Sequence, residues 1–90
     1  ISFFFKEKNI KDEIKIDQKE ISIKKYKGDK LFYSSKFNTY WSKVFFTKFK
    51  NKSKLSIRES NKETEIATFL HAELKEGLYY KIKKQINLSL

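Results

Sequence analysis

Apolar and polar side chains alternate with a period of two along the first third of the chain, and this alternation constrains the fold more than any other feature. Successive side chains of a strand point to opposite faces of a sheet, so the pattern is typical of strands with one buried face. Gly28 and Asp29 separate two such runs and are typical of a tight hairpin turn. The apolar members of the pattern are Ile1, Phe3, Phe5, Ile14, Ile16, Ile21 and Ile23. The first third is therefore predicted to form antiparallel strands.

The middle of the chain has two possible readings. Between residues 37 and 50, large apolar side chains recur at intervals of three and four, which predicts a helix with one apolar face. Aromatic residues, Val and Thr prefer strands, so a strand remains the alternative. A short strand is expected at Leu55–Arg58.

The last third is predicted to contain a helix followed by a strand. Ser60 and Glu63 have the spacing of a capping box, and Gly77 suits the residue that ends a helix, so a helix is expected over residues 61–76. Residues 78–90 then alternate again and predict a long strand with one buried face.

These elements indicate an α+β fold, with an antiparallel sheet of about five strands and one or two helices packed on one face. A small β-barrel is the alternative. At 90 residues, of which 39% are hydrophobic, the chain is expected to form a single compact domain over residues 1–90.

The charged residues indicate an acidic partner. The formal net charge is +10, and all basic residues except Arg58 are lysines, which act as point charges rather than as rigid phosphate clamps. The absence of cysteine excludes disulfides, thiolate metal sites and a thiol nucleophile, and a single histidine excludes paired-histidine chemistry. No cofactor, metal or catalytic residue is predicted.

A basic stretch with interleaved aromatic residues is the candidate binding surface. Residues 43–58 contain six basic side chains and no acid. On a helix Phe46 would lie opposite the apolar face, so it is expected to be exposed; Tyr33 is a further candidate anchor. The polar side of the predicted last strand would add a second basic surface. The predicted partner-binding residues are Phe46, Lys43, Lys48, Lys50, Lys52, Arg58, Tyr79, Lys81 and Lys83.

The main functional hypothesis is a non-enzymatic adaptor that grips an acidic partner protein through this aromatic–lysine surface or through a sheet edge. Because the chain opens on Ile1 and contains no methionine, a processed secreted effector with a role in virulence is expected, or alternatively an organellar protein after leader removal. No transmembrane segment is predicted, since the longest apolar run is Phe3–Phe5.

Three alternatives accompany this hypothesis. An RNA-associated basic protein, such as a small organellar ribosomal subunit, would use the same lysines. A small nuclease-type toxin would use His71 with Glu73. An amphipathic helix over residues 37–50 would suit the surface of an anionic bilayer, but its aromatic face is better explained as core.

Overall fold

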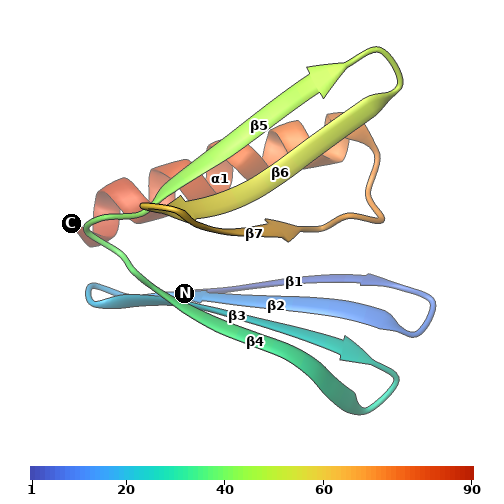
Figure 1. The fold of residues 1–90 in the computed structure, drawn as a ribbon, viewed down its shortest axis with the longest axis horizontal. Helices are drawn as coiled ribbons and strands as arrows, with labels where there is room; N and C mark the ends of the chain where they lie inside the picture. The colour runs from blue at the N-terminus through green and yellow to red at the C-terminus, as the bar shows by residue number, and fades with distance from the viewer.

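The computed structural model describes residues 1–90 as seven strands followed by one helix (Figure 1). The elements are β1 (Ser2–Glu7), β2 (Ile10–Ile16), β3 (Glu20–Lys27), β4 (Lys30–Asn38), β5 (Lys43–Phe49), β6 (Lys52–Glu59), β7 (Lys62–Ile66) and α1 (Ala72–Ser89). Strands β1–β4 form one antiparallel sheet and β5–β7 form another, each in sequence order. The predicted α+β class with a packed helix is confirmed; the barrel is not formed, and the strands divide between two sheets.

A single hydrophobic cluster connects the two sheets and the helix. In Figure 1 the sheets lie one above the other, and α1 runs behind β5 and β6. Ile82 is fully buried and Ile86 is nearly so, which brings the helix into the same core as the strands. The buried hydrophobic residues are Phe5, Ile14, Ile16, Ile21, Ile23, Phe37, Val44, Leu55, Ile57, Ile66, Ala67, Ile82 and Ile86.

Four strand pairs are connected by turns of two residues, and in each turn the first residue has a positive φ while the second is Asn or Asp. Such left-handed conformations match the twist of hairpin strands. The turns are Lys8–Asn9 (φ of Lys8 55°), Gly28–Asp29 (61°), Lys50–Asn51 (55°) and Ser60–Asn61 (53°). The hairpin predicted at Gly28–Asp29 is confirmed, and the other three repeat its chemistry without glycine.

The helix expected over residues 37–50 is wrong. This segment contains the end of β4, a loop and all of β5. The loop is held by Asn38, whose side chain accepts the Trp41 amide at 3.2 Å and whose carbonyl accepts the Ser42 hydroxyl at 2.6 Å. The helical spacing was coincidental, because Phe37 and Val44 are buried in different sheets while Phe49 is exposed. The strand preference of these residues prevails.

The helix expected over residues 61–76 is also wrong. Ser60 has the positive φ of a hairpin turn, whereas a helix N-cap residue is extended. Glu63 does not reach back to the Ser60 amide; it lies on β7 and bonds to Ser56 on β6. Gly77 lies inside α1 rather than after a helix. A capping-box sequence and a Ser-Asn hairpin turn share the same residues here, and pairing between β6 and β7 decides between them.

The strand predicted over residues 78–90 is helix α1 instead. Leu78, Ile82 and Ile86 satisfy a period of two and also recur every four residues, so they support either structure. In the helix they face the core, while Tyr80 and Leu88, which share the apolar side of the expected strand, are 61% and 69% exposed. Tertiary packing selects the helical period.

Side chains rather than backbone pairing join the two sheets, where β3 and β4 contact β7. The amino group of Lys25 donates to the carbonyl oxygen of Glu65 at 2.5 Å, and the hydroxyls of Tyr33 and Thr64 hydrogen-bond at 2.5 Å. The first of these bonds satisfies the Glu65 carbonyl, a main-chain acceptor that a continuous sheet would have paired. Tyr33, expected as an exposed anchor, is thereby tied to the second sheet.

A buried carboxylate joins β2 to the segment before α1. Asp12 is only 3% exposed, and its side chain accepts the amide of Ala67 at 2.8 Å. Ala67 has a φ of 52°, in the left-handed region, so the chain turns sharply after β7 and this bond holds the turn.

A substitution at Gly77 distinguishes a glycine inside α1 from a glycine that ends a helix, because the two positions predict changes in stability of opposite sign. A methyl group added at Gly77 meets no atom within 4 Å, so Gly77→Ala is expected to stabilise the protein by about 0.5–1 kcal/mol through better helix propensity. A glycine that ended a helix with positive φ would respond in the opposite direction. Gly28→Ala is the matched control: its φ of 61° predicts destabilisation by about 1 kcal/mol. Urea unfolding measures both, and a destabilised Gly77→Ala variant would contradict the helix.

Candidate protein-binding groove

Strand β5 has one unpaired edge. It pairs with β6 on one side, and no strand lies on the other. The two-residue turn places Phe49 and Lys52 in a hydrogen-bonded pair, and such pairs alternate with pairs that are not hydrogen-bonded along an antiparallel ladder. Val44 and Phe46 belong to the second kind, so their amides and carbonyls point to the free edge. No backbone hydrogen bond outside the strands and helix reaches β5. The edge therefore carries donors and acceptors that are free to pair with another chain.

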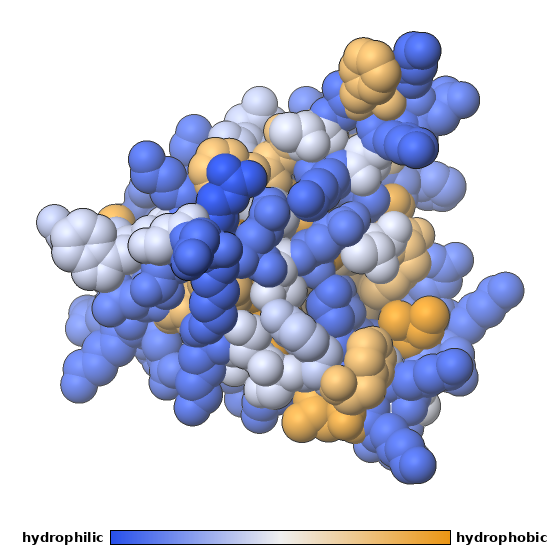
Figure 2. Space-filling view, in the orientation of Figure 1, coloured by the Kyte–Doolittle hydropathy of each residue, from blue (hydrophilic) through white to orange (hydrophobic).

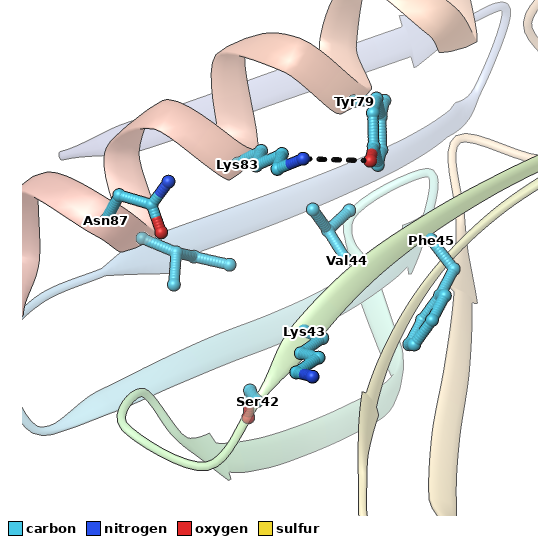
Figure 3. A pocket seen from close by; sticks show the side chains of 8 residues that line it. Ser42, Lys43, Val44, Phe45, Tyr79, Lys83 and Asn87 are labelled. Carbon is cyan, nitrogen blue, oxygen red and sulfur yellow. Dashed lines mark hydrogen bonds between the residues drawn. The ribbon is translucent and has the colours of Figure 1, made fainter.

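A groove of about 360 Å³ lies between this edge and α1. Figure 3 shows Val44 pointing from β5 toward the helix, where Tyr79, Lys83 and Asn87 project toward the strand. Val44 is 8% and Ile86 5% exposed, so they supply an apolar floor. The full lining is Ser42, Lys43, Val44, Phe45, Tyr79, Lys83, Ile86 and Asn87. This β5–α1 groove combines apolar side chains with a free strand edge.

The β5–α1 groove is positively charged. Lys43 lies on its strand side and Lys83 on its helix side, and neither forms an ion pair. No acidic residue lines the groove. Lys83 donates a long hydrogen bond of 3.4 Å to the Tyr79 hydroxyl, which places its ammonium over the cavity (Figure 3). Two uncompensated positive charges beside an apolar floor favour a ligand with negative side chains.

The opposite face of the β5–β7 sheet contains an ion-pair network around Glu63. Its carboxylate accepts hydrogen bonds from the Ser56 hydroxyl at 2.7 Å and from Arg58 at 3.3 Å, and it forms an ion pair with Lys54 at 3.5 Å. The Ser56 hydrogen bond holds the pKa of Glu63 below its ordinary value; burial opposes the shift, and the positive charges of Lys54 and Arg58 support it. The guanidinium of Arg58 also lies 4.4 Å from the centre of the Phe45 ring. These contacts neutralise Arg58 but leave Lys43, its cross-strand neighbour, without an acid.

The structure separates the predicted partner-binding residues. Lys43, Tyr79 and Lys83 line the β5–α1 groove: Tyr79 and Lys83 project from the helix, and Lys43 lies on β5 with its side chain directed away from α1 (Figure 3). Arg58 belongs to the Glu63 network, and Lys81 is exposed on α1 outside the groove. Because the last element is a helix and not a strand, Lys81 no longer shares a face with Tyr79 and Lys83. The remaining lysines surround the β5–β6 turn: Lys48, Lys50 and Lys52.

The expected exposure of Phe46 is wrong. On a strand, Phe46 shares the inner face with Val44, so it packs against the core and is only partly exposed. Its ring centre lies 6.4 Å from that of Tyr79, in a tilted contact that joins β5 to α1. Phe46 therefore supports the wall of the groove. Its role in partner binding remains a prediction.

Sequence reasoning missed five of the eight residues that line the groove. None of the five has unusual chemistry: they are Ser42, Val44, Phe45, Ile86 and Asn87. The one signal in the sequence that locates β5 is Lys50–Asn51, because its pattern matches that of the Gly28–Asp29 turn. A hairpin at this point would have shown that Val44 faces the core.

His71 and Glu73 lie at the start of α1, beside an open hollow that also includes Lys48. The side chain of His71 makes neither a capping hydrogen bond nor an ion pair. A general base needs a partner that orients it, so this arrangement gives no support to the nuclease-type alternative. No group of three His, Cys, Asp or Glu side chains is placed to hold a metal ion.

Comparison with protein families matches residues 1–86 to DUF2244, whose description is integral membrane protein. The chain belongs to this family. Comparison with curated proteins gave no match, and comparison with solved structures gave none either.

The family description corrects the expected localisation. It points to an integral membrane protein, so the expectation of a secreted protein is wrong. The expected effector and virulence roles find no support. Helix α1 does not combine the length and apolar character that a membrane-spanning helix requires.

The lowered pKa of Glu63 predicts how this network responds to acid. Its folded pKa lies below the ordinary value of 4.5, so the carboxylate contributes stability above about pH 4.5, and that contribution is lost as the pH falls through the folded pKa. Ser56→Ala removes the largest cause and should move the pKa of Glu63 upward in a carboxyl NMR titration. Ser53→Ala, on the same strand with no hydrogen bond from its hydroxyl, is the control. An unchanged Glu63 pKa in Ser56→Ala would contradict the assigned cause.

Proposed function

We propose that this chain is a non-enzymatic protein-binding domain that takes up an extended, acidic segment of a partner protein along the free edge of β5. The segment adds one antiparallel or parallel strand to the β5–β7 sheet and lies in the β5–α1 groove. The observation that carries the proposal is the coincidence of three features at one place: an unpaired strand edge, an apolar floor, and two lysines without acidic partners.

The free edge of β5 supplies affinity for an extended segment that does not depend on the side chains of that segment. Strand addition satisfies main-chain donors and acceptors on both partners, as in other domains that bind extended peptides. The outward amides and carbonyls of Val44 and Phe46 are the groups available for this pairing.

The side chains of the groove supply selectivity. Alternate residues of an added strand would point toward the apolar floor at Val44 and Ile86, so small β-branched residues fit there. The residues that face α1 would also pass near Lys83, and the alternate residues, on the opposite face of the sheet, would pass near Lys43, so carboxylates are favoured at both places. The net charge of +10 would also speed the encounter with an acidic segment at low salt.

A binding role is also supported by the chemistry of the groove. Its polar groups are two ammonium groups, a phenol, a hydroxyl and a carboxamide, which hold and orient a ligand. The one hydrogen bond among them runs from the Lys83 amino group to the Tyr79 hydroxyl at 3.4 Å, so the phenol accepts a hydrogen bond and is not held toward a base that would activate it.

A synthetic peptide of about seven residues, the length of an ordinary strand, with alternating Glu and Val is the probe. Binding is measured by NMR titration of the ¹⁵N-labelled protein at low salt. The expected shifts are confined to β5 and the facing side of α1. The variant Lys43→Glu/Lys83→Glu is expected to weaken binding by about tenfold or more. Lys15→Glu/Lys24→Glu, on the four-stranded sheet, carries the same charge change and should have a much smaller effect.

Two further probes separate strand addition from simple charge attraction. The same peptide with N-methylated backbone amides keeps its charge but cannot pair, so it is expected to bind far more weakly. A single-stranded oligouridylate tests the RNA alternative. Equal binding of the methylated peptide, or shifts at the groove with RNA alone, would overturn the proposal.

A further inference from the structure

The turn between β5 and β6 exposes an aromatic side chain at the corner of the molecule. Phe49 is 73% exposed, more than any other large hydrophobic residue of the chain. Figure 2 shows an orange patch surrounded by blue at the corner where Figure 1 places this turn. A phenylalanine so exposed at a hairpin tip lowers the solubility of the protein, and it does not pack in the hydrophobic core.

Positive charge surrounds this aromatic tip. Lys48, Lys50 and Lys52 are exposed, none of them forms an ion pair, and residues 47–53 contain no acid. The amino group of Lys50 lies 5.4 Å from the centre of the Phe49 ring. Lys50 also has a φ of 55°, so it occupies the tip of a tight turn and projects with Phe49 from the body of the sheet. The nearest acid along the adjoining hollow is Glu73, on the α1 side of Lys48.

We propose that the β5–β6 turn is a membrane anchor, in which Phe49 inserts into the headgroup region of an anionic lipid bilayer while Lys48, Lys50 and Lys52 contact lipid phosphates and carboxylates. An aromatic residue partitions favourably into the interface, and each nearby lysine adds attraction to anionic lipid. Since the chain belongs to a family described as integral membrane protein, a bilayer is the charged surface expected beside this domain. The anchor is separate from the β5–α1 groove and does not depend on it.

The opposite end of the molecule has exposed aromatic residues but mixed charge. Tyr40 and Trp41 are 66% and 68% exposed in the loop before β5, with ring centres 4.8 Å apart. Acidic residues contact this loop: the Glu59 carboxylate accepts the Asn38 amide at 2.7 Å, and the backbone carbonyl of Asp17 accepts the Thr39 hydroxyl at 2.8 Å. Glu20 and Glu59 lie at this end beside Lys19, Lys36 and Lys62, whereas residues 47–53 contain lysines and no acid, so the β5–β6 turn is the better anchor for an anionic surface.

Sedimentation with phosphatidylcholine vesicles, with and without phosphatidylserine, tests the charge requirement. Lys48→Gln/Lys50→Gln/Lys52→Gln is expected to lower partitioning into the anionic vesicles by roughly fivefold per lysine at low salt. The control Lys6→Gln/Lys15→Gln/Lys24→Gln removes the same charge from the outer face of the four-stranded sheet and should retain most of the binding. Equal losses in the two variants would overturn the proposal, since net charge alone would then explain the attraction.

A tryptophan reporter tests insertion. The chain has a single tryptophan, Trp41, which is expected to show no fluorescence change with anionic vesicles because it lies away from the anchor. In a Trp41→Phe background, Phe49→Trp places the only indole at the turn, and its emission should shift to the blue and be quenched by brominated lipid. Phe49→Ser should weaken partitioning by about tenfold. Quenching of Trp41 in the wild-type chain, or none at position 49, would contradict the assigned anchor.

Discussion

The burial of Ile82 of α1 against the β-sheets is the contact on which the rest of the arrangement depends. The helix has no side-chain hydrogen bond at its N-cap residue and no basic residue in its last turn, so its ends contribute little to its stability. Its outward face carries Tyr80 and Leu88, whose exposed side chains contribute no buried surface to its stability. Tertiary packing of Ile82 and Ile86 therefore holds the helix and sets its position along β5.

That position leaves β5 with a free edge, which most sheet proteins avoid or protect. Backbone groups of β4 and β7 are bonded to side chains, since Glu59 accepts the Asn38 amide and the Glu65 carbonyl accepts Lys25, whereas no such bond reaches β5, which carries Lys43 and Lys48. Edge lysines discourage pairing with a second copy of the same basic chain and leave the edge open to acidic strands. Lys43 and Phe49 lie at opposite ends of β5, about 20 Å apart at the rise of a strand, so the groove and the proposed anchor can be occupied together.

The fold class, the hairpin at Gly28–Asp29 and the short strand at Leu55–Arg58, which lies within β6, could be predicted from the sequence because their signals are local. The other later elements could not. Leu78, Ile82 and Ile86 satisfy both the strand and the helix period, and Ser60 suits both a cap and a turn, so only long-range packing decides. For the same reason only part of the site could be predicted. Its charged residues are visible in the sequence, but the apolar floor at Val44 depends on a strand assignment that the sequence left open.

Amide hydrogen exchange along β5 tests the central claim most directly. In the free protein the amides of Val44 and Phe46 should exchange quickly, while those of Phe45 and Thr47, which pair with β6, should be protected. With the alternating Glu–Val peptide bound, the Val44 and Phe46 amides are expected to become protected and the others to change little. Protection of these two amides in the free protein, or protection appearing elsewhere on binding, would contradict strand addition at the β5 edge.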